Sequence, residues 1–195
     1  MVIGFVVAAP VGPIGVLCIR RTLAEGRSSG FVSGLGAATA DALYSSVAAL
    51  GLTFVMNLLV GGELWLRLLG GAFLIFLGIK AFLAYPAESA ASAGRRGLLG
   101  AYASTFFLTL TNPATILSFA AIFAGLGAGD VGGDVYSAML LVLGVFLGSA
   151  LWWLILSGTT GLFRVKLSAR GLRWVNRVSG TVIASFGVLA VSGLG

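Results

Sequence analysis

Histidine is absent from this sequence, cysteine occurs only once, and charged residues make up 9% of its 195 positions. Without histidine, no proton relay or catalytic dyad can use an imidazole. The single cysteine, Cys18, excludes an intramolecular disulfide, a CxxC redox pair and a cysteine metal cluster. The low charge excludes an ordinary soluble domain, in which about 25% of residues are charged. Since the usual parts of a catalytic centre are missing, we predict no enzyme, no cofactor and no metal site.

Hydrophobic residues dominate what remains, at 58% of the chain with a mean hydropathy of +1.07. The apolar runs repeatedly reach the roughly 20 residues that a helix needs to cross a bilayer. The 30 glycines fit this class, because small residues let membrane helices approach closely. We therefore predict a single all-α domain over residues 1–195, embedded in a lipid bilayer. The net charge of +6 does not indicate nucleic acid, because the basic residues lie between apolar runs.

Six apolar runs are separated by turn and charge clusters, and they predict six transmembrane helices. These are Val2–Ile19, Phe31–Leu58, Leu64–Tyr85, Leu98–Leu126, Val135–Leu162 and Trp174–Leu194. Lys and Arg gather in alternate connections, after the first, third and fifth spans, while the two other connections contain none. Because positive loops stay on the cytoplasmic side, both termini are predicted outside.

The two halves of the chain resemble each other in three places. Gly36-x-x-x-Ala40-Asp41-Ala42-Leu43-Tyr44 aligns with Gly144-x-x-x-Gly148-Ser149-Ala150-Leu151-Trp152 without gaps. Arg67-x-x-Gly70 aligns with Arg177-x-x-Gly180, and Pro13-x-x-x-Leu17 with Pro113-x-x-x-Leu117. The order of the matches indicates a duplication, with repeat one at 1–85, a small and polar linker at 86–97 and repeat two at 98–195. Three spans per unit insert the second copy upside down, so we predict two inverted three-helix repeats.

Proline interrupts the first and fourth spans, at Ala9-Pro10-Val11-Gly12-Pro13 and at Thr111-Asn112-Pro113. A broken backbone at membrane depth persists only where protein or a polar cavity shields it, and paired breaks in two halves indicate the binding site of a transporter. Each break could instead be a mere kink, with the Asn112 side chain replacing the hydrogen bond that proline removes. On the functional interpretation, the substrate path includes Pro10, Gly12, Pro13, Thr111, Asn112 and Pro113.

Asp41 lies near the middle of the second span, where a carboxylate costs roughly 2.5–3.5 kcal/mol on insertion scales. Intramembrane acids of this kind are usually functional, so Asp41 is predicted to couple protons or to bind a substrate ammonium. The alternative is a carboxyl that merely ties helices together. Tyr44 and Ser45 lie three and four residues later and share its helix face, which adds both to the predicted substrate path.

The residues quoted so far resemble the LysE/RhtB family of bacterial exporters. The matching stretches are Pro10-Val-Gly-Pro13 with Arg20-Arg21, Gly34-Leu-Gly36 with Ala40-Asp41 and Tyr44, Gly70 with Gly78, and Leu110-Thr-Asn112-Pro113 with Ile116-Leu117. The family's common Pro-Gly-Pro is Pro-Val-Gly-Pro here, and Ile14 stands where an Asn commonly follows. The resemblance implies a six-helix exporter of amino acids or similar metabolites in the bacterial inner (cytoplasmic) membrane, driven by the proton motive force. It also makes a homodimer plausible.

Two other functions stay open from the sequence. A permease for a small ion or metal would conduct independently of amino acids, although a chain without His and with one Cys offers few soft ligands for transition metals. A membrane scaffold that transports nothing would respond to changes at Pro13, Asp41 or Asn112 only in abundance and partner binding.

Overall fold

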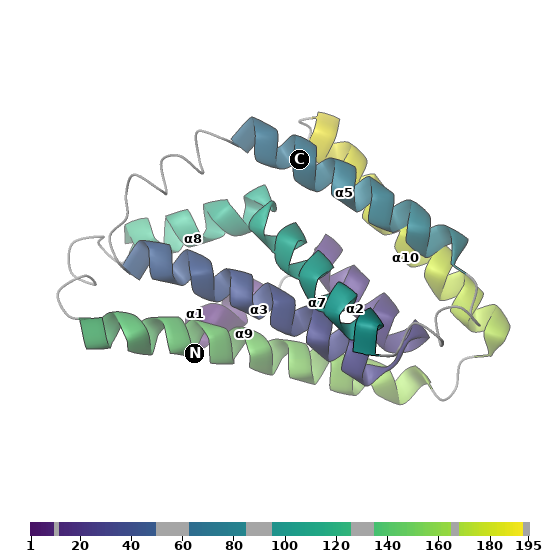
Figure 1. Cartoon of the computed structure of the whole chain (residues 1–195), viewed down its shortest axis with the longest axis horizontal. Coiled ribbons are helices and arrows are strands. Elements are labelled where there is room, and N and C mark those ends of the chain that lie inside the picture. Colours follow the sequence, from purple (N-terminus) through teal and green to yellow (C-terminus); the bar gives the residue numbers. More distant parts are fainter. Residues whose placement is uncertain (10–11, 50–62, 85–94, 126–134, 165–167, 193–195) are drawn as a thin grey trace.

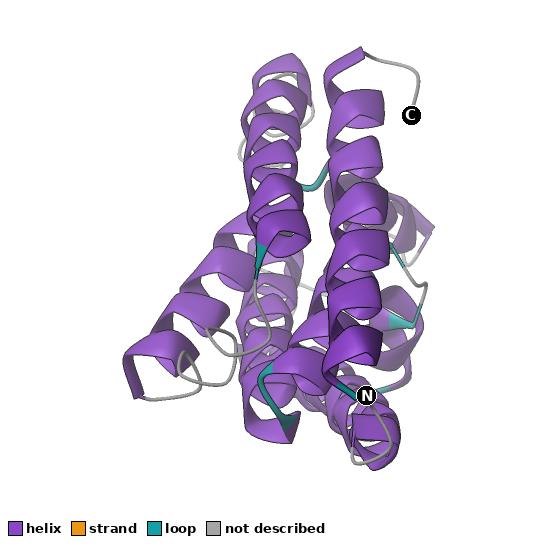
Figure 2. Ribbon diagram, turned by 90° about the vertical axis from the view of Figure 1, so that its right-hand side faces the viewer, coloured by secondary structure: helices purple, strands orange, loops and turns teal. Residues whose placement is uncertain are grey.

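The computed structural model describes residues 1–9, 12–49, 63–84, 95–125, 135–164 and 168–192. Every regular element among them is an α-helix, and none is a strand (Figure 2). The predicted substrate-path residue Pro10, most of the predicted linker and the last third of the predicted second span lie outside the described residues. Over the part that is described, the all-helical prediction is confirmed.

The first and fourth predicted spans are each divided at their proline break. The first consists of α1 (Val2–Ala8) and α2 (Pro13–Ala24), whose axes are bent by 82°. The fourth consists of α7 (Arg95–Leu110) and α8 (Pro113–Gly125). Proline begins both α2 and α8 because its missing N–H costs nothing at the first position of a helix.

The four other helices follow the remaining predicted spans, with shifted ends. They are α3 (Arg27–Ala49), α5 (Glu63–Leu83), α9 (Val135–Arg164) and α10 (Ala169–Ser192). A tight turn joins α2 to α3, and Gly26 adopts a φ of 117° there, which a side chain would disfavour.

Three described helical segments are long and apolar enough to cross a membrane: Leu64–Leu83, Val135–Phe163 and Arg170–Ser192. The bent pair of α1 and α2 would make a fourth if it counts as one span. α3 is not among them, although it has 23 residues. Its buried positions are mostly Gly, Ala and Ser, which suit a helix enclosed by protein rather than by lipid.

The helices pack into groups that mix the two halves of the sequence. α5 and α10 run side by side along one edge of the molecule, while α3 packs between α9 and α7 (Figure 1). α5 and α10 approach so closely that a Cβ on Gly78 would lie 2.8 Å from the carbonyl oxygen of Gly180. Apart from α10, α5 has few contacts with the other described helices, and α10 reaches them mainly through α2.

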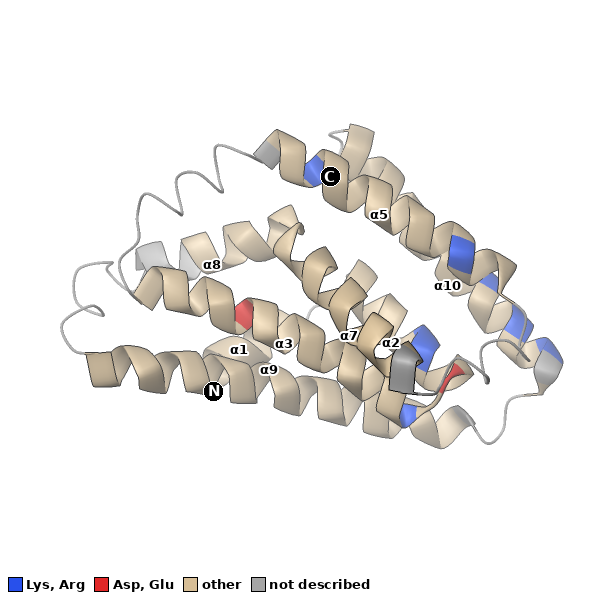
Figure 3. Cartoon of the chain, viewed as in Figure 1, with Lys and Arg blue, Asp and Glu red and all other residues tan. Residues whose placement is uncertain are grey.

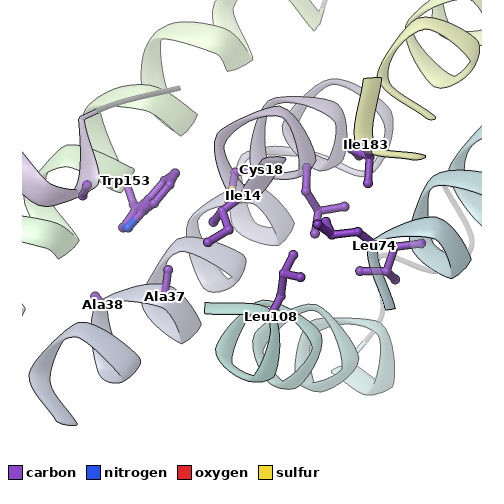
Figure 4. Close-up of a cluster of buried hydrophobic side chains, with 11 residues drawn as sticks. Ile14, Cys18, Ala37, Ala38, Leu74, Leu108, Trp153 and Ile183 are labelled. Atoms are coloured by element: carbon purple, nitrogen blue, oxygen red, sulfur yellow. The ribbon is translucent and has the colours of Figure 1, made fainter. Parts of the chain in front are cut away.

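α2 lies at the centre of the largest apolar cluster. Its residues Ile14, Leu17 and Cys18 pack with Leu74 of α5 and Leu108 of α7, and other members of the cluster come from α1, α3, α9 and α10 (Figure 4). A short and mostly buried helix is thus the element that joins the α5–α10 pair to the rest of the bundle.

The positions of two arginines correct the sequence analysis. Arg20 and Arg21 were expected in a loop between the first two spans, but both lie in α2 and are only 8% exposed. Nearby oxygen acceptors make this burial possible, because Arg21 alone donates to acceptors on α3 and α7. Lys and Arg still gather at one end of the molecule, where α2 and α5 end and α10 begins (Figure 3).

Candidate functional site

The second break is built around the side chain of Asn112. Its Oδ1 accepts a hydrogen bond from the backbone N–H of Ala114 at 3.2 Å, which caps the start of α8. Its Nδ2 donates to Oγ1 of Thr115 at 3.0 Å. In an unbroken helix, the N–H of Ala114 would donate to the carbonyl of Leu110, but here it donates to Asn112. The Tyr44 hydroxyl instead donates to the Leu110 carbonyl, at 2.5 Å. Asn112 and Tyr44 therefore replace the backbone hydrogen bonds that the break removes.

The first break has no comparable side chain. Gly12 is the N-cap of α2, with φ −92° and ψ −164°, and no side-chain hydrogen bond caps the helix. Ile14 lies where the resemblance would place an Asn, and it is an apolar residue of the core. The two breaks thus differ: one helix start is capped by the chain's own amide, and the other is not.

Both breaks open onto one cavity of about 400 Å³. Gly12 and Pro13 from the first break, Asn112 and Pro113 from the second, and Asp41 from α3 all line it. Each of the described helices contributes at least one residue to the wall. Five of the residues that the sequence placed at the site therefore meet in space, although they are up to 101 positions apart.

Asp41 is the ionisable residue among the described residues that line this cavity. It is 3% exposed, and its Oδ2 accepts a hydrogen bond from Oγ of Ser149 at 2.8 Å. The same Oγ accepts from the indole N–H of Trp153 at 3.1 Å, so the donors form a short chain that ends at the carboxylate. None of the described residues that line the cavity is Lys or Arg. The carboxyl therefore faces the cavity without a cationic partner among the residues that the structure describes.

Three predicted path residues do not line the cavity. Tyr44 is 2% exposed, with its hydroxyl at Leu110 and its ring stacked on Phe119 at a centroid distance of 5.7 Å. The Ser45 hydroxyl donates to the carbonyl of Ala42 in its own helix. Thr111 lies beside a neighbouring space of about 20 Å³ and bonds back to α7. Sharing a helix face with Asp41 was therefore not enough to place Tyr44 and Ser45 on the cavity wall.

Ser149 and Trp153 are the residues that the sequence analysis missed. Ser149 is fully buried and Trp153 is 4% exposed, and Trp153 lines the cavity. A signal for Ser149 was present, because the repeat alignment places Ser149 at the position equivalent to Asp41. The alignment alone did not show that these two residues are hydrogen-bonded to each other in the fold. Among the described residues, no group of three or more His, Cys, Asp and Glu lies together.

A second cavity, of about 680 Å³, lies beside the buried arginines. Leu17 and Leu77 belong to its wall, whereas Ile14 and Leu74, one helical turn earlier on α2 and α5, belong to the wall of the first cavity. All four side chains are members of the same apolar cluster. We call Ile14, Leu17, Leu74 and Leu77 the apolar layer, because they separate the central cavity from this second one.

Comparison with known families identifies the family of the chain. The family described as "LysE type translocator" matches residues 5–193, which is nearly the whole chain. The chain belongs to the LysE translocator family. The resemblance seen in the sequence is confirmed, and with it the expectation of a membrane protein of a transporter family.

Proteins from two bacteria are among the relatives of this LysE-family protein. The "Putative amino acid efflux protein YcgF" of Bacillus subtilis (strain 168) is 29% identical over 193 residues, which cover 96% of this chain and 90% of that protein. The "Uncharacterized membrane protein YahN" of Escherichia coli (strain K12) is 26% identical over 180 residues, which cover 86% of this chain and 76% of that protein. No solved structure matches the chain with significance.

Proposed function

We propose that this protein exports amino acids or related small metabolites across the bacterial cytoplasmic membrane in exchange for protons. One observation carries the proposal: both proline breaks and Asp41 line a single cavity whose described wall contains no Lys or Arg. The family and the efflux relative from Bacillus subtilis support a transporter. A cavity of about 400 Å³ falls within the range of small-molecule sites.

The chemistry of the cavity suits a molecule with both an ammonium and a carboxylate. Asp41 offers its carboxylate to an ammonium group or to a proton, and the two compete because either one neutralises a buried charge. The start of α2 has no side-chain cap, and a helix N-terminus favours a negative group. An amino acid can use both ends, and protonation of Asp41 after release would complete the exchange.

Three contacts between the halves support the inverted repeat. Asp41 and Ser149 occupy equivalent positions in the alignment and are hydrogen-bonded to each other, as expected for residues beside a twofold axis. Along α5 and α10, the backbone of Gly71 meets that of Gly187, and Gly78 meets Gly180. A shift of 109 positions exchanges the two glycine contacts, and this is within one position of the offset between the aligned Arg67 and Arg177. Inverted symmetry of this kind places a substrate site at the repeat interface, where Asp41 lies.

The packing also supports a motion that alternates access. The central cavity is closed toward the arginine end by the apolar layer, in which α2 and α5 each supply two side chains. Since α5 contacts mainly α10, the α5–α10 pair can swing as a unit relative to the other helices. Opening the layer would expose the cavity to the arginine end, which the positive-inside rule assigns to the cytoplasm.

Purified protein in liposomes with an imposed pH gradient tests the proposal. Counterflow and efflux of a panel of labelled amino acids should identify at least one substrate whose flux follows the gradient. Asp41→Asn should abolish the pH dependence but keep the fold, because the amide oxygen can still accept from Ser149. Coupled transport at the wild-type rate in this variant would refute the role of Asp41.

Glu25→Gln is the matched control, since it also removes one carboxylate but lies at the second cavity. Its ratio of protons to transported substrate should be that of the wild type, because this ratio depends on Asp41 and not on the charge of the second cavity. Flux of an inorganic ion without any amino-acid flux would instead favour an ion permease. Absence of all flux in folded protein would favour a membrane scaffold.

A further inference from the structure

The second cavity carries an inference beyond the central site. We call it the basic vestibule; it has a volume of about 680 Å³ and is lined by Arg20, Arg21, Glu25 and Lys80, together with Ser104 and mainly apolar residues of α5. Three cations and one anion give its described wall a net charge of +2. These charges lie in a cavity lined by apolar side chains, so their field is screened less than on an open surface.

Arg21 is buried with neutral partners alone. Nη1 donates to the Ser33 and Thr105 hydroxyls at 2.9 Å and to the Ala101 carbonyl at 3.0 Å, and Nη2 donates to the Ser104 hydroxyl at 2.7 Å. No described carboxylate lies within salt-bridge distance of this guanidinium. Its hydrogen bonds fix its position, and the Glu25 carboxylate acts on its charge only from beyond ion-pair distance, so the charge is compensated only in part, which is costly for a buried ion.

Arg20 is little better compensated. Its Nε donates to the amide oxygen of Asn176 at 3.1 Å, and its Nη1 lies 3.9 Å from the Glu25 carboxylate, which is beyond hydrogen-bond distance. Glu25 also accepts from the Ser29 hydroxyl, so its charge is shared. Lys80 is exposed at the rim of the vestibule. The vestibule thus holds more positive charge than its own carboxylate can neutralise.

We propose that the basic vestibule is a docking site for a carboxylate, which receives the acid end of the substrate before the substrate passes the apolar layer. The inference rests on the proposed export function, because it treats the vestibule as the entrance to the central cavity. Leu17 and Leu77, two side chains of the apolar layer, line the vestibule on the side of that cavity. It narrows the substrate class to molecules with a carboxylate. A phospholipid phosphate has similar oxygens and could enter beside Phe76, which is 57% exposed, so the test includes lipid composition.

Gly100 provides a probe inside the vestibule. A Cβ added at this position meets no atom within 4 Å, so Gly100→Cys can be placed there without strain. Gly158 of α9 is equally open, lies outside the vestibule lining and serves as the matched control. Both variants are made with Cys18→Ala, which removes the single native thiol.

The protein in phosphatidylcholine vesicles is reacted, in separate experiments, with two methanethiosulfonate reagents. One carries a negatively charged sulfonate, and the other carries a positively charged trimethylammonium group. The anionic-to-cationic rate ratio should be about fivefold higher at Gly100→Cys than at Gly158→Cys, given two nearby net charges. Acetate should slow labelling of the Gly100→Cys thiol, whereas acetamide, its neutral counterpart, should not. Equal ratios at the two sites, or no protection by acetate, would overturn the proposal.

Two further arms identify the source of the charge and of the ligand. Lys80→Gln should lower the ratio at Gly100→Cys, whereas Arg173→Gln, an equal charge change at an exposed site on α10 outside the vestibule lining, should not. If phosphatidylglycerol in the vesicles removes the anion preference at Gly100→Cys but leaves Gly158→Cys unchanged, the vestibule holds lipid phosphate and the substrate assignment fails.

The labelling ratio is independent of flux. If the labelling ratio is as predicted but no amino acid is transported, the carboxylate site stands and the export proposal fails. If amino acids are exported but the ratio is not as predicted, the export proposal stands and the vestibule proposal fails. If both proposals hold, Lys80→Gln should raise the KM of an exported amino acid about threefold with little change in the maximal rate. A charge at the rim affects how fast the substrate associates with the site, not the later steps of transport.

Discussion

Replacing Gly78 by alanine tests whether α5 and α10 depend on backbone contact. A Cβ at this position would lie 2.6 Å from the Ala184 nitrogen and 2.8 Å from the Gly180 oxygen, both of them backbone atoms that cannot rotate away. Restoring ordinary contact at 3.4 Å requires the helices to separate by about 0.8 Å locally. Overpacking of this kind costs about 1–3 kcal/mol.

Gly100→Ala is the matched control, because its new methyl group meets nothing within 4 Å. There the substitution should only gain the helix propensity of alanine, about 1 kcal/mol. Gly78 also lies inside a helix, so both variants gain that propensity, and they should differ in unfolding free energy by the overpacking cost of about 1–3 kcal/mol, or roughly 3–10 °C in the thermal midpoint for a chain of this size. Thermal unfolding in one detergent, followed by circular dichroism, measures this difference. Equal midpoints would refute the close packing of α5 on α10.

Three further changes address the breaks and the apolar layer. Tyr44→Phe should lower the unfolding free energy by about 1–3 kcal/mol, since it leaves the Leu110 carbonyl without its donor; denaturant titration measures this, and an unchanged midpoint would contradict it. Asn112→Ala should cost about 1 kcal/mol through loss of the α8 cap, whereas Asn112→Asp should retain most of the stability; equal losses would exclude capping. Leu17→Ala should let an impermeant thiol reagent from the arginine side reach a Gly12→Cys probe faster, and an unchanged labelling rate would show that the apolar layer does not block the path.

The central cavity was largely predictable because its parts obey local rules. Proline at helix starts, and a carboxylate amid apolar residues, are visible in a sequence without any tertiary contact. Gly12, Pro13, Asp41, Asn112 and Pro113 meet at one cavity as the sequence suggested. The six-span inverted repeat is a prediction of the same kind, and it stays within the proposal.

Features that depend on distant partners were not predictable. Hydropathy assigns Arg20 and Arg21 to a loop, because it takes no account of distant hydrogen-bond acceptors. The Ser and Thr acceptors that allow the burial of Arg21 come from α3 and α7, and Ser104 is more than 80 positions away. The direction of the Tyr44 hydroxyl likewise depends on a carbonyl that is freed only when the chain breaks at Asn112. A helix face can be derived from spacing, but the atom that a side chain binds cannot.

The pairing of α5 with α10 has a consequence for synthesis of the chain. The glycine face of α5 is formed early, yet the helix that covers it lies about 100 residues downstream (Figure 1). During insertion, Gly71 and Gly78 therefore contact lipid or an insertion factor until α10, which carries Gly180 and Gly187, has been synthesised and inserted. A ribosome that stalls before α10 leaves a half-assembled protein with an open small-residue seam, and quality control could recognise it by that seam.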